Sequence, residues 1–341
     1  MVLPTVISQP GTSLRSLIGA FVLTKLTEGK SPRTIEFYAE NLRRFVWYAE
    51  NQNWPQDILG ITQWHIKAFL GYVAIEKSRW GLRGNGSETS QKRASQATVR
   101  HYYNVLKRFY NWLVEEGILG ENLMDRIHVA KPAPPVISPY SQEEIRKMLA
   151  ICDYDFEHNA RFLGSRNRAI ILVLLDAGLR LSELLAMKLG DIKEENGHIK
   201  ILGKGRRERI VRVGKTAKWA VDRYLTYRPQ NGRQELWLNE EGKPLNGSGL
   251  QSLVKRLKKR AGVDSEGSIH RFRHTFALEF LRADRNVFNL QYLLGHAELE
   301  MVRRYTKAMG MEDALKAHEM SSPADMLDLS STNIVHERVK T

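Results

Sequence analysis

Six side chains between positions 180 and 305 are of the types needed to cut a phosphodiester with a tyrosine: Arg180, Lys204, His270, Arg273, His296 and Tyr305. A tyrosine has a pKa of about 10, so roughly one in a thousand is ionised at neutral pH. Two arginines and a histidine would stabilise the charge that attack builds on the phosphate oxygens, and nearby positive charge would lower the tyrosine pKa. The set predicts a phosphate site with a nucleophilic tyrosine, and its chemistry requires no metal.

Arg180 follows an apolar helical segment and a glycine, where a charged side chain needs a fixed partner. Its planar guanidinium can bind two non-bridging oxygens of one phosphate. Glu183, three residues later, could orient it. A purely structural Arg–Glu pair at a helix start is an equal alternative when this pair is taken alone.

Lys204 lies between two glycines at the tip of an expected hairpin. Glycines allow the backbone to lie close to a ligand, and a lysine held there could protonate a departing hydroxyl. Most loop lysines are simply solvated, which is the alternative. The neighbouring Arg206, Arg207 and Arg209 suggest that this hairpin reaches toward DNA.

His270 and Arg273 are three residues apart and would share one face of a helix. We interpret His274 as structural. His296 follows a glycine, and Tyr305 comes nine residues later on an expected helix. Taken singly, each histidine is more often structural and the tyrosine more often a core residue. These structural interpretations lose weight because all six of them would have to be correct at the same time.

The net charge of +14 is concentrated in one part of the chain. Residues 200–273 hold 19 lysines and arginines against 7 aspartates and glutamates, a difference of +12. Such a block favours a polyanion, because each neutralised phosphate releases counterions; an acidic lipid surface or mere solubility are the alternatives. The candidate DNA contacts are Arg206 and Arg207 in the hairpin, Lys255, Arg256, Lys258 and Lys259 on an expected helix at 250–261, and Lys92 and Arg93 in the polar loop 78–94.

Apolar periodicity predicts an all-helical domain at residues 13–129, after a flexible start at 1–12. Ser31 and Thr62 are suited to cap two of its helices. The expected helices lie near residues 14–26, 32–46, 62–73 and 95–117.

Four prolines within residues 130–139 predict an extended, semi-rigid linker. The second domain, residues 140–309, is expected to mix helices with a short hairpin. Its strands are predicted at 199–202 and 209–213, and an apolar helix at 169–175. The tail, residues 310–341, contains a predicted helix at 311–320.

Several classes of protein are disfavoured. The single cysteine, Cys152, excludes an intramolecular disulfide and fits a reducing compartment. No apolar run is long enough to span a bilayer, and the N-terminus does not have the pattern of a signal peptide. HExxH and CxxC motifs are absent, and Gly214-Lys215-Thr216 does not end a nucleotide-binding loop because Arg209 stands where its first glycine belongs. We expect no cofactor, no metal and no membrane partner.

The order and spacing of these residues resemble the tyrosine recombinases, the phage integrase family. The resemblance is carried by AGLRLSEL at 177–184, HRFRHTF at 270–276, LLGH at 293–296 and Tyr305. It implies that Lys204 is the general acid, that Tyr305 is the nucleophile, and that phosphate binding and activation fall to Arg180, His270, Arg273 and His296. Two positions depart from the family pattern: Phe272 stands where leucine is common, and Asp284 where glycine is frequent. We expect neither to disturb the site.

The resemblance implies a fold that is mainly α with a small antiparallel β-sheet. A helical, SAM-like core-binding domain would precede an α+β catalytic domain, and the two would form a C-shaped clamp on DNA. Family members assemble as homotetramers on two duplex sites and exchange strands through a Holliday junction. Their 3′-phosphotyrosyl link keeps the bond energy, so ATP is not consumed. The tail would dock on a neighbouring protomer, with a frayed terminus as the alternative, through Met326, Leu327, Leu329, Ile334 and Val335.

The sequence thus predicts a site-specific recombinase that acts on double-stranded recombination sites in a prokaryotic cytoplasm, at the nucleoid. Integration and excision of a mobile element is favoured over chromosome-dimer resolution, with an accessory DNA-bending or directionality factor as a further partner. One alternative is a type IB topoisomerase-like enzyme that nicks and reseals one strand. The other is a non-catalytic DNA-binding protein of the same fold, against which the intact six-residue set argues.

Overall fold

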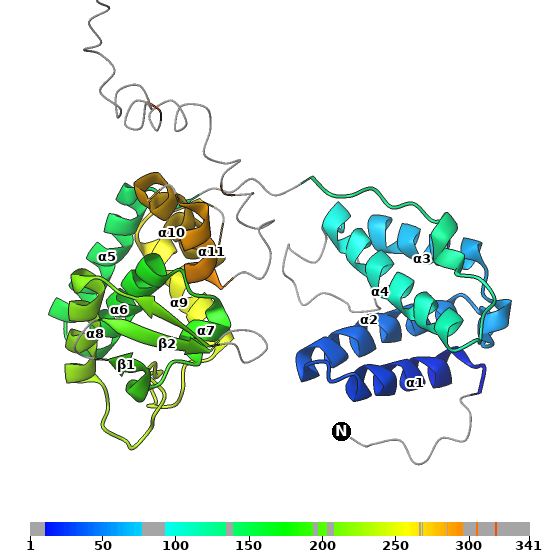
Figure 1. Ribbon diagram of the computed structural model, residues 1–341, viewed down its shortest axis with the longest axis horizontal. Helices are drawn as coiled ribbons and strands as arrows, with labels where there is room; N and C mark the ends of the chain where they lie inside the picture. The colour runs from blue at the N-terminus through cyan, green and yellow to red at the C-terminus, as the bar shows by residue number, and fades with distance from the viewer. Residues whose placement is uncertain are drawn as a thin grey trace, which may run out of the picture. The chain divides into compact units, whose positions relative to one another are not determined.

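The chain divides into two compact units, Met1–Pro135 and Val136–Thr341, as Figure 1 shows. The computed structural model describes residues 11–76, 93–133, 139–193, 197–202, 208–265, 267, 269–284, 286–295, 305 and 318. Each unit has its own cluster of buried apolar side chains. The division falls inside the proline-rich segment 130–139.

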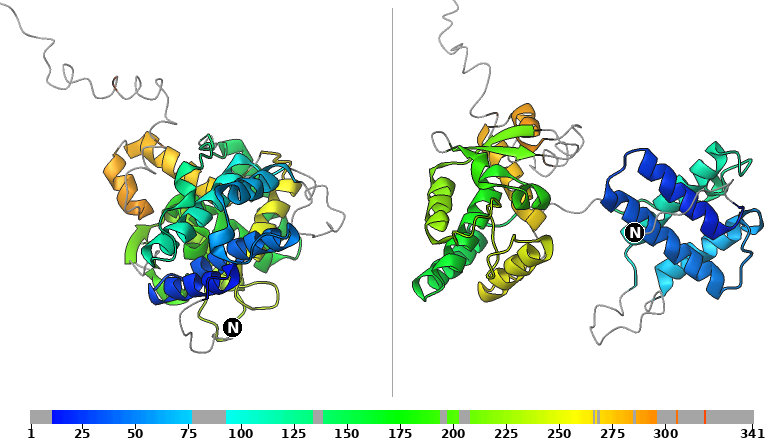
Figure 2. Two further views of the ribbon diagram at one scale, coloured as in Figure 1. Left: turned by 90° about the vertical axis from the view of Figure 1, so that its right-hand side faces the viewer. Right: turned by 90° about the horizontal axis from the view of Figure 1, so that it is seen from below.

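The N-terminal unit is helical, as predicted. Its helices are α1 (Leu14–Thr27), α2 (Pro32–Asn51), α3 (Gln63–Ile75) and α4 (Gln96–Glu115), with 3₁₀ turns η1 (Ile58–Gly60) and η4 (Leu123–Arg126). The hydroxyls of Ser13, Ser31 and Ser95 accept hydrogen bonds from the first turns of α1, α2 and α4, which satisfies amides that the helix itself leaves unpaired. Helices α1 and α2 run side by side (Figures 1 and 2).

Aromatic rings fill the core of this unit. Each of its four helices contributes one fully buried phenylalanine: Phe21, Phe45, Phe69 and Phe109. Phe21 meets Phe109 edge to face at 5.5 Å, and Phe45 meets Phe69 at 5.0 Å between ring centroids. Edge-to-face pairs of this kind stabilise a core beyond their buried area, so these rings help to hold the four helices together.

The C-terminal unit is built around α6 (Arg161–Ala177), which packs against α5, α8, α10 and β3 (Figures 1 and 2). The predicted apolar run lies in its C-terminal half, where Ala169, Ile170, Ile171 and Leu174 are fully buried. The helix is longer than that run because polar residues extend its first turns. The other helices are α5 (Gln142–Glu157), α7 (Leu181–Leu185), η5 (Leu189–Asp191), α8 (Lys215–Tyr227), α9 (Gly247–Arg260), α10 (Ile269–Asp284) and α11 (Val287–Leu294).

The predicted hairpin is present within a three-stranded antiparallel sheet of order β1-β2-β3. Its strands are β1 (Ile192–Lys193), β2 (His198–Leu202) and β3 (Glu208–Arg212); β1 was not predicted. Ile199 pairs with Val211 and Ile201 with Arg209. Since facing residues in a ladder share one side of the sheet, Arg209 lies on the same side as these buried apolar residues. The fold is therefore mainly α with a small antiparallel sheet, as predicted.

A small separate core joins α10 to α11 and to Tyr305, and consists of Phe276, Ala277, Leu278, Leu281, Leu290, Leu294 and Tyr305. The predicted tail helix at 311–320 and the five apolar tail residues fall outside the described residues. Within the described ranges, no helix has the length and apolarity that crossing a bilayer requires.

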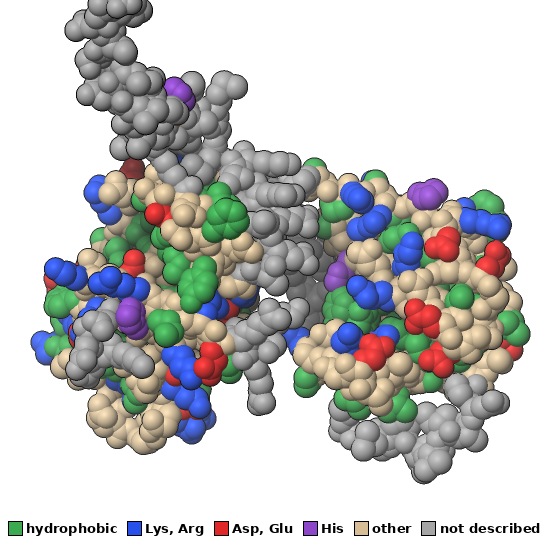
Figure 3. All heavy atoms as spheres, in the orientation of Figure 1, with side chains coloured by type: hydrophobic (Ala, Val, Ile, Leu, Met, Phe, Trp, Pro, Cys, Tyr) green, Lys and Arg blue, Asp and Glu red, His purple; other side chains and the backbone are tan. Residues whose placement is uncertain are grey.

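Charges are distributed differently over the two units. On the face shown in Figure 3, acidic and basic side chains are interspersed over the N-terminal unit, whereas basic ones gather in groups over the C-terminal unit. This matches the concentration of positive charge between residues 200 and 273.

Candidate active site

Arg180 and Glu183 are brought together by the turn between α6 and α7. Helix α6 ends at Gly178, which has a left-handed backbone with φ 57°. Arg180 is the N-cap residue of α7, and its backbone N–H donates to Oε2 of Glu183 at 2.8 Å. Its Nη1 donates to Oε1 of the same carboxylate at 2.8 Å. The contact expected between Arg180 and Glu183 is therefore present, through both backbone and side chain.

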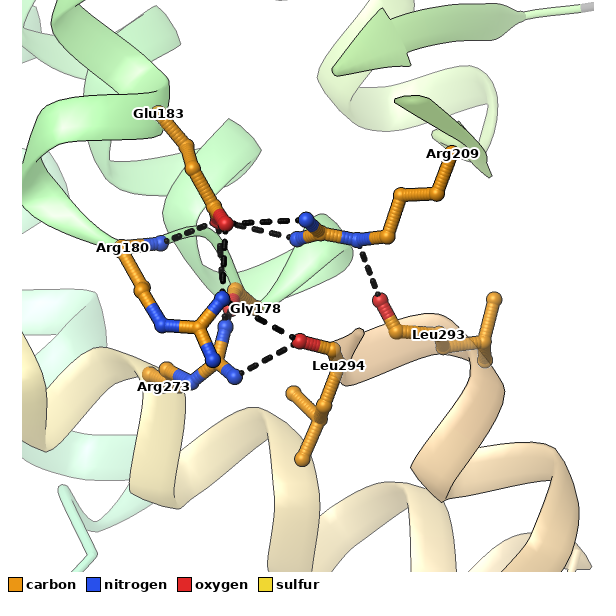
Figure 4. Close-up of polar contacts among 7 residues, drawn as sticks. All are labelled: Gly178, Arg180, Glu183, Arg209, Arg273, Leu293 and Leu294. Atoms are coloured by element: carbon orange, nitrogen blue, oxygen red, sulfur yellow. Dashed lines mark hydrogen bonds and ion pairs between the residues drawn. The ribbon is translucent and has the colours of Figure 1, made fainter. Parts of the chain in front are cut away.

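Arg273 reaches the same place from α10. Its Nη1 donates to the carbonyl of Gly178 at 2.6 Å and its Nη2 to the carbonyl of Leu294 at 2.8 Å. Nη1 of Arg180 lies 3.5 Å from that Leu294 oxygen, so two guanidiniums converge on one carbonyl (Figure 4). Burial, followed by the charge of Arg180, lowers the pKa of Arg273 to about 10. Arg273 thus stays charged at neutral pH.

Arg209, one of the three arginines that suggested a hairpin reaching toward DNA, lies in this cluster instead. Its Nη1 and Nη2 donate to the two oxygens of Glu183 at 2.8 and 2.9 Å. Its Nε donates to the carbonyl of Leu293 at 2.9 Å (Figure 4). Burial alone would raise the pKa of Glu183, but hydrogen bonds from Arg209 and Arg180 outweigh it and bring that pKa down to about 2.

The cluster carries an excess of positive charge. One carboxylate, Glu183, faces three guanidiniums, with Arg273 at 3.9 Å in addition to Arg180 and Arg209. The side chain of Arg180 is 32% exposed, whereas those of Arg209 and Arg273 are 9% and 5% exposed. Within the described part of the chain, Nε and Nη2 of Arg180 have no hydrogen-bond partner. The cluster can therefore present N–H donors and net positive charge to an anion.

Tyr305 packs beside this cluster and is almost fully buried, at 1% exposure. Its Oη lies 3.0 Å from Nδ1 of His274, the residue that follows Arg273 on α10. Burial lowers the pKa of His274, and the charges of His270 and Arg273 add to the effect. A neutral imidazole is thereby favoured, and one of its nitrogens can accept a proton or a hydrogen bond.

Sequence reasoning gave His274 no part in the site, and the structure places it against the phenol. Its position next to Arg273 was the one signal that could have suggested this. His270 is exposed one helical turn before His274 and has no hydrogen-bond partner among the residues described. Lys204 and His296 lie outside the described residues. The elements that flank them are known: β2 and β3 on either side of Lys204, and the end of α11 before His296.

The expected DNA contacts divide into three groups. Lys255, Arg256 and Lys259 are exposed on α9, and Arg93 is exposed before α4. Lys258 instead donates to the carbonyls of Ser265 and, at 3.1 Å, Gly267, just beyond the end of α9. The others, Arg206, Arg207 and Lys92, lie outside the described residues.

Arg260, also on the basic helix, is bound to an acid that the local sequence does not reveal. Its two terminal nitrogens donate to the oxygens of Asp155 on α5 at 2.8 and 2.6 Å. Among the residues that the structure describes, no group of three or more His, Cys, Asp or Glu is arranged to hold a metal ion.

Family models match both units. The phage integrase family model matches residues 140–310, and the model of the phage integrase N-terminal SAM-like domain matches residues 17–118. Tyrosine recombinase XerD of Listeria monocytogenes serotype 4b (strain F2365) is 27% identical over 300 residues, which cover 86% of this chain and 94% of that protein. Tyrosine recombinase XerC of Leptospira interrogans serovar copenhageni is 29% identical over 283 residues, covering 82% and 85%.

Solved structures share the fold. The XerH site-specific recombinase bound to difH substrate has a TM-score of 0.65 at 21% identity, covering 89% of this chain and 97% of that one. A lambda integrase tetramer bound to a Holliday junction has a TM-score of 0.65 at 19% identity, covering 87% and 78%. The arrangement of a SAM-like helical domain followed by an α+β domain is common to them.

Proposed function

The chain belongs to the phage integrase family and is a tyrosine recombinase, an enzyme that breaks and rejoins DNA, and from this premise we propose that it exchanges strands between two specific duplex sites through a 3′-phosphotyrosyl intermediate. Tyr305 Oη attacks the scissile phosphorus and the 5′-oxygen leaves. The phenolic proton passes to a neighbouring histidine, and Lys204 protonates the leaving oxygen. Attack by the 5′-hydroxyl of the second duplex reverses these steps and joins the exchanged strands.

The observation that carries this proposal is the convergence of Arg180 and Arg273 beside the phenol of Tyr305. The two guanidiniums meet at the Leu294 carbonyl, and the residue after Arg273 contacts Tyr305 Oη at 3.0 Å. A phosphate bound by both arginines would place its phosphorus near that oxygen. Donors preorganised for developing charge are each worth about a hundred- to thousand-fold in rate.

The histidines would divide the proton transfer. His274 already touches the phenol, and its lowered pKa favours the neutral form that can receive the proton. His270 and His296 would hydrogen-bond the non-bridging oxygens and share in the activation. Glu183 orients Arg180. The bond energy stays in the phosphotyrosyl link, so the reaction would proceed without ATP or a metal cofactor.

The DNA would be held by both units. Residues 13–129 would form a core-binding domain and residues 140–309 the catalytic domain, joined by the linker 130–139. Lys255, Arg256, Lys258 and Lys259 on α9, the hairpin residues Arg206 and Arg207, and Lys92 and Arg93 would contact phosphates.

The enzyme would act as a homotetramer through a Holliday junction, with residues 310–341 docking on a neighbouring protomer. The lambda integrase tetramer on such a junction shows that this fold supports the assembly in that protein. We propose that it integrates or excises a mobile element in the cytoplasm of a prokaryote, aided by a DNA-bending or directionality factor.

A covalent-adduct assay tests the nucleophile. The protein is incubated in EDTA with a nicked duplex taken from the DNA that flanks its gene, and the products are run on a denaturing gel. We expect an adduct from the wild type and from Tyr292→Phe, whose ring is 70% exposed on α11. Tyr305→Phe should form none, because it keeps the ring and lacks the attacking oxygen. An adduct that survives Tyr305→Phe would refute the assignment.

A second readout separates recombination from topoisomerase chemistry. Two labelled duplexes are mixed with the enzyme, and a supercoiled plasmid serves as a parallel substrate. Junctions and recombinant products between the duplexes support the proposal. Relaxation of the plasmid without any junction would select the nicking-resealing alternative.

A further inference from the structure

Arg209 lies on the covered side of β3, a side that is otherwise apolar. Arg209 faces Ile201 across the ladder and shares the covered side of the sheet with Val211. The adjacent Ile210 is 54% exposed. A slip of one residue would bury Ile210 and expose Arg209, but it would also expose Val211 and Val213 and turn Glu208 and Arg212 inward. The observed register therefore buries the two valines and places the guanidinium of Arg209 beside them, inside the fold.

Three elements of the proposed active site meet at that guanidinium. Its fork binds both oxygens of Glu183 in α7. Its Nε binds the carbonyl of Leu293 near the end of α11, two residues before Gly295. A Cβ on Gly295 would lie 3.1 Å from Cδ of Arg209, so the left-handed turn at φ 63° lies directly against the arginine. The strand that follows the Lys204 loop is thus tied to both Arg180 and the turn that precedes His296.

The charge of Arg209 also affects how many hydrogen bonds Glu183 draws from Arg180. Glu183 is 2% exposed and accepts hydrogen bonds from both arginines. Without Arg209, the buried carboxylate would have to satisfy its oxygens through Arg180 and through Arg273, which is 3.9 Å away. A buried charge that loses its partner draws on whatever donors remain. Those donors are the ones that a phosphate needs.

We propose that Arg209 is a positioning residue for strand cleavage. It neutralises and holds Glu183, so that Arg180 keeps Nε and Nη2 for the scissile phosphate. It also fixes the end of α11 relative to β3. This inference rests on the proposed function of the site, and it assigns Arg209 no contact with DNA.

The first test compares Arg209→Gln with Arg212→Gln. Arg212 is the matched control because it lies on the same strand and is exposed on the opposite side. In single-turnover formation of the Tyr305 adduct, we expect Arg209→Gln to be about ten- to a hundred-fold slower than wild type. Residues that orient the ligands of metal sites have effects of this size when they are mutated. DNA affinity should change no more than in Arg212→Gln. Equal cleavage rates for the two variants would overturn the proposal.

A double variant distinguishes positioning from a general structural role. If Arg209 acts by occupying Glu183, then Glu183→Gln should restore much of the rate lost in Arg209→Gln, because the competing charge is gone. Arg209→Lys, which keeps the charge but not the fork, should fall between wild type and Arg209→Gln. Losses that simply multiply in the double variant would show that Arg209 acts independently of Glu183.

A third measurement needs no cleavage and so remains informative if the recombination proposal itself fails. Inorganic phosphate should raise the melting temperature of the protein by occupying the arginine cluster. Arg180→Ala defines the part of that rise that belongs to the cluster, and Arg212→Gln controls for general salt effects. We expect Arg209→Gln to lose most of the rise in melting temperature that is due to phosphate binding at the arginine cluster. A rise in Arg209→Gln as large as that in Arg212→Gln would overturn the positioning role even in a protein that cuts no DNA.

Discussion

At the scale of single residues, the site is organised by one buried carboxylate. Glu183 accepts from the backbone of Arg180 and from two guanidiniums, and a third lies 3.9 Å away. A carboxylate in this position lets several arginines approach one another because it offsets part of their positive charge. The remaining positive charge faces outward through Arg180, where a phosphate can use it.

The stability of the protein should depend on the ionisation of Glu183. Its pKa of about 2 in the folded state lies below the ordinary value of 4.5. The carboxylate therefore stabilises the fold fully above pH 4.5, and this contribution is lost as the pH falls toward 2. The shift corresponds to roughly 3 kcal/mol. In urea unfolding, the difference in free energy between wild type and Glu183→Gln should shrink between pH 5 and 2.5.

The control for this pH dependence is Glu241→Gln, which changes an exposed glutamate. Its difference from wild type should be small throughout the range. A difference for Glu183→Gln that stays constant over this range would contradict the assigned cause.

At the scale of elements, the turn between α6 and α7 is the part of the fold that aligns the two arginines. Gly178 has φ 57°, and a Cβ there would lie 2.2 Å from the ring of Phe276 on α10. Its carbonyl accepts from Arg273. The missing side chain thus lets α10 approach the end of α6 closely enough for Arg273 to reach the site.

Gly178→Ala should destabilise the C-terminal unit more than a comparable glycine change. The left-handed backbone costs about 1–2 kcal/mol for alanine, and the overlap with Phe276 adds about 1–3 kcal/mol. Gly262→Ala is the matched control, because its φ is 61° and no atom lies within 4 Å of the added Cβ. Chemical unfolding of both variants isolates the cost of the overlap. Equal losses would mean that α10 moves away without penalty.

At the scale of the whole molecule, function depends on where the positive charge is exposed. Lys255, Arg256 and Lys259 are exposed on α9, whereas Arg260 is held by Asp155. Exposed cations that contact phosphates release counterions on binding, and each contact contributes about −0.9 to the slope of log K against log salt.

Substitutions on α9 should therefore differ in their effect on DNA binding. On a duplex of arbitrary sequence, Lys255→Gln should reduce the magnitude of the salt slope by about 1. Arg260→Gln should change it less, because that guanidinium already has an acidic partner. Fluorescence anisotropy between low and moderate salt measures both slopes. An unchanged slope for Lys255→Gln would remove Lys255 from the interface.

Local signals in the sequence determined most of the fold and the identity of the six candidate residues. Serine caps, apolar periodicity and the linker prolines act over a few neighbouring residues, so the helices, the hairpin and the two-part organisation could be predicted. Order and spacing along the chain were likewise enough to pick out Arg180, His270, Arg273 and Tyr305 as candidates.

Only the tertiary structure decided which side chains meet. Arg209 binds Glu183 and the end of α11, His274 contacts Tyr305, and Arg260 pairs with Asp155. These partners are 26 to 105 residues apart in the chain, beyond the reach of caps and periodicity. For Arg209 the valines at 211 and 213 indicate which side of β3 is covered, but nothing near it in the sequence indicates a carboxylate that could pair with a guanidinium there. Burying a paired guanidinium there is favourable only once α7 and α11 have brought a carboxylate and a carbonyl to the sheet.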